Sequence, residues 1–340
     1  MVYPWLNDAL ARLLEGRRRF ASSLLIYGPK GGGAFALARR TAEELLCKTP
    51  DASGHACGRC EDCKLAAAGT HPDLRIVTTE ALAAALDLPY YTDAKRGGED
   101  KKTLSREILL PQVRATAGLL DMTSARSGAR VVVIYPAEAI RAEAAAALLK
   151  AVEEPPEGVH FIFASESLDD VLPTLRSRSR LFALSLPDEA QALSFLAQKG
   201  VADARAKLAF EGGSPVAVLE PWHAAAADEA THGKLLALLR AGKALSAEGL
   251  VTGLSAEMTV PVLCRYFTRW ASDLLRVRFG LPPDFFPDEA AALSGLAAQT
   301  TPEKLLDFYD AMLFAARDAE HPLNAKQTAE GLFWKYRQAL

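Results

Sequence analysis

A glycine-rich loop between an apolar run and a helical pattern is the feature that most constrains how this chain can fold. Residues 24–27 are apolar, the loop runs from Gly28 to Gly33, and an Ala- and Leu-rich stretch typical of a helix continues to Leu46. A strand, a glycine loop and a helix in this order direct backbone N–H groups and a helix N-terminus at the place where a phosphate binds. The stretch therefore predicts an α/β domain with the framework of a nucleotide-binding loop.

The loop lacks the side chains that nucleotide chemistry requires. In the pattern G-x-x-x-x-G-K-[ST], the lysine binds the β- and γ-phosphates and the hydroxyl group binds Mg²⁺. With the glycines in register, Ala34 takes the place of the lysine and Phe35 that of the hydroxyl residue, while Lys30 lies too early. We expect weak nucleotide binding or none at the loop glycines, Gly28, Gly31, Gly32 and Gly33. Residual binding stays open, because backbone N–H groups can hold phosphate without the lysine.

Length and composition indicate a protein of several domains. A chain of 340 residues is too long for one ordinary core, so we expect two or three domains. The net charge of −3 argues against nucleic-acid binding through the overall field of the protein. The chain opens without a signal-peptide pattern and contains no apolar run long enough to span a membrane, so we expect a cytoplasmic protein.

Strand and helix signals alternate over roughly the first 165 residues and then become purely helical. The apolar runs at 130–134 and 159–164 predict buried strands, and 142–154 predicts a helix between them. This alternation is typical of a parallel α/β domain. Beyond Pro187 every periodic stretch is helical, and the lone Cys264 there is predicted to be a small buried apolar residue. One of these stretches carries apolar residues at helical spacing that we assign to a bundle core: Leu305, Leu306, Tyr309, Met312 and Leu313.

Residues 83–107 form a charged stretch with paired glycines, which we interpret as an insertion whose contacts stay open.

Four of the five cysteines lie close together in the sequence: Cys47, Cys57, Cys60 and Cys63. Four thiolates complete a closed tetrahedral zinc shell, so we predict a structural zinc site without an open position for substrate. An iron–sulfur cluster is the main alternative, although the C-x₃-C-P continuation of that pattern is absent. His55 and His71 are close enough in the sequence to serve as substitute ligands.

Further stretches, together with the glycine loop and the cysteines, resemble one known family. They are Thr-His-Pro-Asp at 70–73, Ala-Leu-Leu-Lys-Ala-Val-Glu-Glu-Pro-Pro at 147–156, Leu-Arg-Ser-Arg-Ser-Arg at 175–180 and His-Pro-Leu-Asn-Ala-Lys at 321–326. The third is similar to a Ser-Arg-Cys motif, with Ser179 in the cysteine position. In this order they resemble the delta-prime family of bacterial DNA polymerase III clamp loaders, which belongs to the AAA+ class.

The resemblance implies an α/β plus all-α fold with three domains. These are an AAA+ ATPase-like parallel α/β domain over 1–166 with the cysteine module at 47–63, a helical lid over 167–222, and a helical collar over 223–340. It also implies a ring subunit that does not hydrolyse ATP. Counted back from the helix at 142–154, the acidic pair of active relatives falls at Tyr135 and Pro136, and Val216 replaces an arginine of the lid.

Arg178 is the one catalytic group that the resemblance retains. The resemblance implies that Arg178 is an arginine finger, which contacts the ATP bound to a neighbouring gamma/tau subunit. The alternative is that Arg176, Arg178 and Arg180 point outward in turn from an edge strand as solubilising charge. The implied partners are gamma/tau and delta, with the sliding clamp and primed DNA reached through the whole complex.

Two other functions stay open at this point. An active P-loop ATPase is disfavoured because Ala34, Phe35, Tyr135 and Pro136 all lack the required chemistry. A zinc-dependent DNA-binding module is disfavoured by the acidic net charge. We therefore expect no intrinsic catalysis, with nucleotidyl transfer belonging to the polymerase holoenzyme.

Overall fold

The computed structural model describes residues 3–15, 21–52, 54–90, 104–121, 124–126, 128–219, 229–244, 258–317, 319 and 325–340. Within it the chain divides into two compact units, Met1–Pro187 and Asp188–Leu340. Residues 91–103 of the predicted insertion and 321–324 of the last family-like stretch lie outside the described residues. The further division of the chain into three domains stays a prediction.

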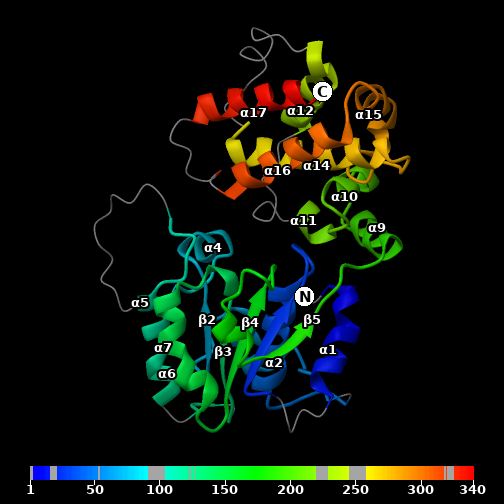
Figure 1. The fold of residues 1–340 in the computed structure, drawn as a ribbon. Helices are drawn as coiled ribbons and strands as arrows, with labels where there is room; N and C mark the ends of the chain where they lie inside the picture. The colour runs from blue at the N-terminus through cyan, green and yellow to red at the C-terminus, as the bar shows by residue number, and fades with distance from the viewer. Residues whose placement is uncertain are drawn as a thin grey trace. The chain divides into compact units, whose positions relative to one another are not determined.

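The first unit is built on a parallel sheet with strand order β2-β3-β4-β1-β5 (Figure 1). The strands are β1 (Ser23–Tyr27), β2 (Leu74–Val77), β3 (Arg130–Ile134), β4 (Val159–Ser165) and β5 (Arg180–Ala183). The apolar runs of β1, β3 and β4 therefore form strands as predicted. These three strands lie inside the sheet, where helices cover both faces and the buried side chains are mostly apolar.

Alternate residues of the strands enter two separate cores. Leu24 and Ile26 pack beneath α1 and α2 on one face, whereas Leu25 packs beneath α5 and α7 on the other. The helices of this unit are η1 (Pro4–Leu6), α1 (Asn7–Leu14), α2 (Ala34–Leu46), α3 (Glu61–Ala67), α4 (Glu80–Ala85), α5 (Leu110–Arg114), α6 (Ala117–Asp121), η3 (Ala137–Ala139), α7 (Ala142–Glu153) and α8 (Pro173–Arg176). Since helices cover both faces, the doubly wound α/β arrangement is confirmed.

The second unit is helical throughout its described residues. Its elements are α9 (Glu189–Gln198), α10 (Ala204–Phe210), α11 (Pro215–Leu219), α12 (Glu229–Ala241), η4 (Gly242–Ala244), α14 (Val260–Arg278), η5 (Pro287–Glu289), α15 (Ala290–Ala297), α16 (Pro302–Arg317) and α17 (Ala325–Ala339). The central helix α14 packs against α15, α16 and α17. The fold is thus an AAA+ type of α/β unit joined to a helical unit, as predicted.

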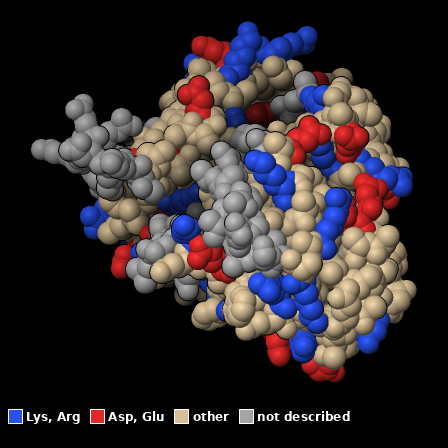
Figure 2. All heavy atoms as spheres, turned by 90° about the horizontal axis from the view of Figure 1, so that it is seen from above, with Lys and Arg blue, Asp and Glu red and all other residues tan. Residues whose placement is uncertain are grey.

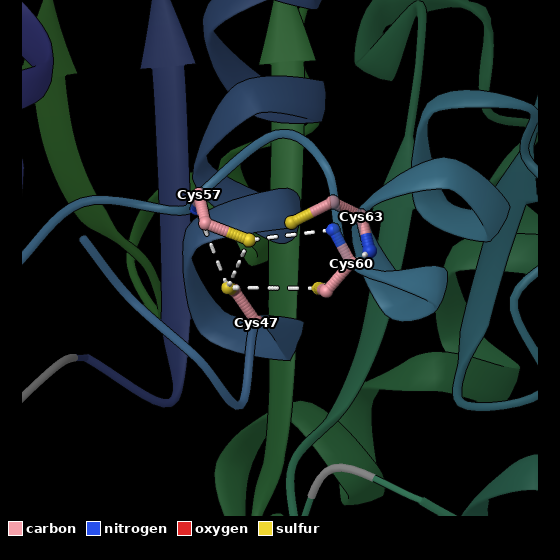
Figure 3. A group of neighbouring side chains, drawn as sticks. All are labelled: Cys47, Cys57, Cys60 and Cys63. Atoms are coloured by element: carbon pink, nitrogen blue, oxygen red, sulfur yellow. Dashed lines mark hydrogen bonds between the residues drawn. The ribbon is translucent and has the colours of Figure 1, made fainter.

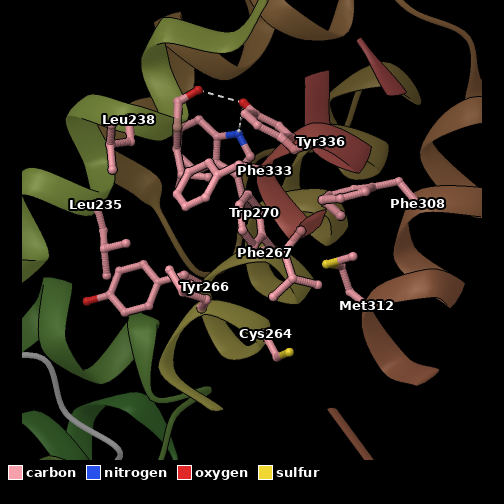
Figure 4. Close-up of a cluster of buried hydrophobic side chains, with 14 of the residues drawn as sticks. Leu235, Leu238, Cys264, Tyr266, Phe267, Trp270, Phe308, Met312, Phe333 and Tyr336 are labelled. Atoms are coloured by element: carbon pink, nitrogen blue, oxygen red, sulfur yellow. Dashed lines mark hydrogen bonds between the residues drawn. The ribbon is translucent and has the colours of Figure 1, made fainter. Parts of the chain in front are cut away.

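Aromatic side chains fill the core around α14 (Figure 4). Trp270 is fully buried and donates its indole N–H to the Tyr336 hydroxyl at 2.9 Å, and that hydroxyl donates to the Leu239 carbonyl at 2.5 Å. The buried Trp270 indole N–H and the buried Tyr336 hydroxyl therefore both have hydrogen-bond partners. Cys264 lies buried in the same core, which confirms the prediction of a small buried apolar residue, and burial raises the pKa of its thiol to about 11.

The prediction for α16 is only half right. Leu305 and Met312 are buried in the core, but Leu306 and Leu313 are exposed. The pattern of apolar residues is wider than the face of α16 that the other described helices cover.

Two surface properties bear on function. Within the described residues, no helix combines the length and the apolar character that crossing a membrane requires. On the face drawn in Figure 2, basic and acidic side chains lie among uncharged residues.

Candidate functional site

The glycine loop lies at the carboxyl edge of the sheet, directly after the interior strand β1. Gly28 donates its N–H to the Ser165 carbonyl of β4 at 3.3 Å, and a Cβ on Gly28 would lie 2.8 Å from the Leu184 carbonyl oxygen. Gly33 caps α2 with φ +94°, where a Cβ would also lie 2.9 Å from Leu6 Cδ1. Packing and backbone conformation therefore both require glycine at these positions.

An aromatic pair lies beside the loop, formed by two residues that the sequence pattern assigns to the metal-binding positions of active relatives. Phe35, in the position of the hydroxyl residue, stacks on Tyr135, in the position of an acidic residue, with ring centroids 4.5 Å apart and an interplanar angle of 12°. Mg²⁺ requires oxygen ligands at such a site, and the methyl group of buried Ala34 replaces the lysine ammonium. The structure thus brings together the substitutions that the sequence predicted separately.

A glutamate that sequence reasoning missed faces the loop. Glu166 follows the last residue of β4, and its Oε1 accepts the Gly31 N–H at 3.2 Å and the Tyr135 hydroxyl at 3.3 Å. Its own N–H donates to Glu138 Oε1 at 3.1 Å, and burial raises the pKa of Glu138. The signal that could have identified Glu166 is its place at the carboxyl end of a predicted interior strand, where the ligands of α/β sheets bind.

Val216, the predicted substitute for the arginine of the lid, is buried in α11 of the second unit. Its side chain has no polar group that could bind phosphate, and the same is true of Ala34 and Phe35 after the loop.

Arg178 lies in the turn between α8 and β5. Its Nε forms an ion pair with Glu153 of α7, and its Nη1 donates to the Thr174 carbonyl at 3.2 Å and to Ser177 Oγ at 3.3 Å. The Arg178 and Glu153 side chains are 34% and 46% exposed, so solvent screens this ion pair and the guanidinium is not locked in the interior.

The edge-strand alternative for the three arginines is wrong. β5 is an edge strand, but it begins only at Arg180, whereas Arg176 ends α8 and Arg178 lies in the turn. The three side chains therefore cannot alternate along one strand.

The four clustered cysteines converge on one point (Figure 3). Their Sγ atoms all lie within 4.8 Å of one another, and Cys47 Sγ is 3.9 Å from that of Cys57 and 4.0 Å from that of Cys60. Sulfurs around a tetrahedral zinc with Zn–S of about 2.3 Å are about 3.8 Å apart. The arrangement therefore fits a four-sulfur metal site.

The backbone around the cluster favours thiolates. Backbone N–H groups of Cys57, Cys60 and Cys63 point at the preceding sulfur of the cluster, at 3.4–3.5 Å. The Thr49 hydroxyl, with the N–H groups of Arg59 and Cys60, lowers the pKa of the Cys57 thiol to about 6. Burial raises the pKa of the Cys63 thiol, so burial disfavours its thiolate form. A bound cation would offset this cost of deprotonation.

Neither candidate histidine belongs to the sulfur cluster. His71 Nδ1 accepts the Asp73 N–H at 3.0 Å and its Nε2 lies 3.4 Å from Asp62 Oδ1. His55 Nδ1 lies 3.6 Å from Glu44, whose carboxylate also accepts the Ala56 N–H at 2.5 Å. Both histidines thus face carboxylates, and the four sulfurs remain as the ligand set; Glu44 of α2 binds the cysteine segment through the Ala56 N–H.

The parallel sheet, the glycine loop after β1, and the helical unit define an AAA+ type of fold, in which Ala34 and Phe35 follow the glycine loop. The chain belongs to the DNA polymerase III delta subunit family, whose model matches residues 6–188.

The relatives carry more specific names. The chain is 37% identical over 220 residues to DNA polymerase III subunit delta' of Pseudomonas aeruginosa, a match that covers 63% of this chain and 60% of the relative. It is 35% identical over 223 residues to the Escherichia coli K12 protein of the same name, covering 64% and 60%. The match thus spans about 60% of the length of these relatives.

Among solved structures, a gamma subunit-related protein of Thermotoga maritima matches with a TM-score of 0.44 at 18% identity, covering 98% of both chains.

Proposed function

We propose that this chain is a delta-prime subunit of a bacterial DNA polymerase III clamp loader, a ring member that does not hydrolyse ATP. In this role it pairs with gamma/tau and delta subunits and helps the complex to load the sliding clamp on primed DNA. The names of its relatives support the subunit type. The stacked pair of Phe35 and Tyr135 carries the non-hydrolysing part of the proposal.

Phosphoryl transfer depends on electrostatic stabilisation of charge by a lysine, a metal and a residue that positions water. Here the corresponding positions hold Ala34, Phe35, Tyr135 and Pro136, and Val216 stands in for the arginine of the lid. Because several separate contributions are missing together, restoring any one of them is not expected to restore hydrolysis.

Arg178 is proposed as the group that this chain gives to its neighbour. Its turn position and its solvent-screened ion pair with Glu153 allow the guanidinium to exchange a carboxylate for a phosphate without losing a buried contact. ATP is then bound and hydrolysed only at the adjacent gamma/tau subunit. An arginine supplied in trans accelerates related reactions by roughly 10³–10⁵-fold.

The test is the ATPase rate of a loader reconstituted with gamma/tau and delta subunits and carrying Arg178→Ala. We expect turnover at the site next to this chain to fall by roughly 10³-fold or more, which lowers the total rate and the rate of clamp loading. Arg180→Ala is the matched control, since Arg180 lies nearby in β5 and is expected to leave both rates unchanged. Unchanged turnover in an Arg178→Ala complex of full size would refute the finger.

The cysteine cluster is proposed to hold a structural zinc ion through Cys47, Cys57, Cys60 and Cys63. The sulfur separations and the donor set support zinc, and the closed shell supplies no position for a reacting water. When bound, zinc would stabilise the fold of the segment between α2 and α3.

A further inference from the structure

The anion position of the glycine loop is filled by this chain's own carboxylate. We infer that Glu166 is a built-in anion that takes the place of a nucleotide phosphate at the Gly28–Gly33 loop and holds the loop in shape without a ligand. This goes beyond the proposed function, because it assigns the ligand class of the loop and the residue that excludes it, whichever complex the chain joins.

The acceptors of the N–H groups in the glycine loop show where the Glu166 carboxylate binds. Gly28 and Gly32 donate their N–H groups to the backbone carbonyls of Ser165 and Pro29. Gly31 instead donates to the Glu166 carboxylate at 3.2 Å. A carboxylate oxygen on a loop N–H ahead of α2 occupies the kind of position that a phosphate oxygen takes at a helix N-terminus.

The backbone on both sides of Glu166 is fixed, which directs its side chain at the loop. The Glu166 N–H donates to Glu138 Oε1 at 3.1 Å. The Ser165 hydroxyl donates to the Ser167 carbonyl at 2.8 Å, and the Ser167 N–H donates back to Ser165 Oγ at 3.1 Å. The carboxylate is therefore presented to Gly31 from a rigid strand end.

The aromatic pair completes the acceptor site. Stacking on Phe35 orients the Tyr135 ring, so that its hydroxyl donates to the same Glu166 oxygen at 3.3 Å. In an active relative these positions serve the metal that bridges the nucleotide phosphates during phosphoryl transfer, and a carboxylate bound to a loop N–H has no use for that metal. Phe35 and Tyr135 thus replace a site that binds phosphate and metal. The site that they form binds one carboxylate of the chain itself.

An aromatic N-terminal segment also contacts the loop. Trp5 donates its indole N–H to the Gly32 carbonyl at 3.4 Å and stacks on Tyr3 at 4.9 Å. Leu6 is buried against Gly33. An internal carboxylate in a covered site has a higher effective concentration than a free ligand and therefore excludes phosphate.

The test is chemical rescue of Glu166→Ala by inorganic phosphate, with the full zinc-loaded chain and thermal unfolding as the measurement. Removal of the carboxylate is expected to lower the melting temperature. Added phosphate is expected to raise it again by about 2–4 °C for each kcal/mol of binding, saturably. Wild type and the exposed-site control Glu157→Ala are expected to respond to phosphate only as they do to sodium chloride of equal ionic strength.

Glu166→Gln keeps the test decisive should the alanine variant not fold. Its amide oxygen still accepts the Gly31 N–H but carries no charge, so its melting temperature is expected to fall less and to respond to phosphate less. A variant at Glu166 that melts like wild type, or that gains no more from phosphate than wild type does, overturns the inference.

Discussion

Single buried carboxylates organise the loops of both units. Asp73 accepts the Ser124 hydroxyl and the N–H groups of Ala125 and Arg126 at 2.7–3.0 Å. Asp273 on α14 accepts three successive backbone N–H groups, those of 284–286, at 2.7–3.0 Å. Asp73 closes the family-like Thr-His-Pro-Asp stretch, so the physical reason for an aspartate there is the loop that it holds.

The second unit contains a histidine whose titration lowers stability in acid. His232 Nδ1 lies 2.6 Å from the Tyr266 hydroxyl. Burial lowers the pKa of His232 below its ordinary value of 6.5, with Glu289 and Arg240 acting in opposite directions, and burial raises the pKa of Tyr266. The folded chain thus favours neutral His232, hydrogen-bonded to the Tyr266 hydroxyl.

We predict that this site makes the free energy of unfolding fall as the pH drops below about 6.5, because the unfolded chain takes up the proton first. Above that pH the contribution is constant. Denaturant unfolding between pH 8 and pH 5 should show a smaller decline for His232→Asn, whose side-chain amide can either donate a hydrogen bond to a hydroxyl or accept one and does not titrate. Parallel curves for the two proteins would contradict this origin of the pH dependence.

At the scale of elements, burial decides which segments the sequence reveals. β1, β3 and β4 are covered on both faces, and each contains an uninterrupted apolar run of at least four residues, at 24–27, 131–134 and 161–164. β5 is a short edge strand with mostly exposed side chains, and Arg75 interrupts the short apolar run of β2. Neither β2 nor β5 shows an apolar pattern that distinguishes a strand from a loop. Sequence patterns therefore identified only the interior strands of the sheet.

The connection between α2 and α3 is the element that depends on the metal. We predict that the purified chain carries a single zinc ion, and that Cys60→Ser or a strong chelator removes it. Loss of the ion should expose residues 47–63 to limited proteolysis and lower the melting temperature, because these residues have little apolar core of their own. Metal analysis is the primary measurement.

Cys264→Ala is the matched control for this experiment, since Cys264 is a buried thiol outside the cluster and its loss should leave the zinc content unchanged. Iron in place of zinc, visible as a brown colour, would contradict the choice of metal but not the ligand set.

At the scale of the whole molecule, the loop and the turn that carries Arg178 have opposite roles. The loop is closed by Phe35, Tyr135 and Glu166. Arg178 is held only by contacts that solvent screens. This contrast supports the proposal that Arg178 acts on a nucleotide held by another subunit.

We predict that the isolated chain does not hydrolyse ATP and that Ala34→Lys does not restore activity. The added ammonium would stand beside a site where Phe35 and Tyr135 still exclude the metal. The measurement is steady-state phosphate release by the purified chain, with a gamma/tau subunit as the active reference. Brisk turnover by either form would contradict the proposed role.

The local sequence alone determined the glycine loop, the four-cysteine cluster, the interior strands and the loss of the catalytic side chains. Each depends on residues close together in the chain, where spacing and burial leave a readable pattern. Only the tertiary structure decided that Phe35 stacks on Tyr135, that Glu166 bonds to Gly31, and that Glu153 pairs with Arg178. These contacts join distant segments at the carboxyl edge of one sheet and the turn before its edge strand. Strand order and register set such distances, and no pattern within a single segment encodes them.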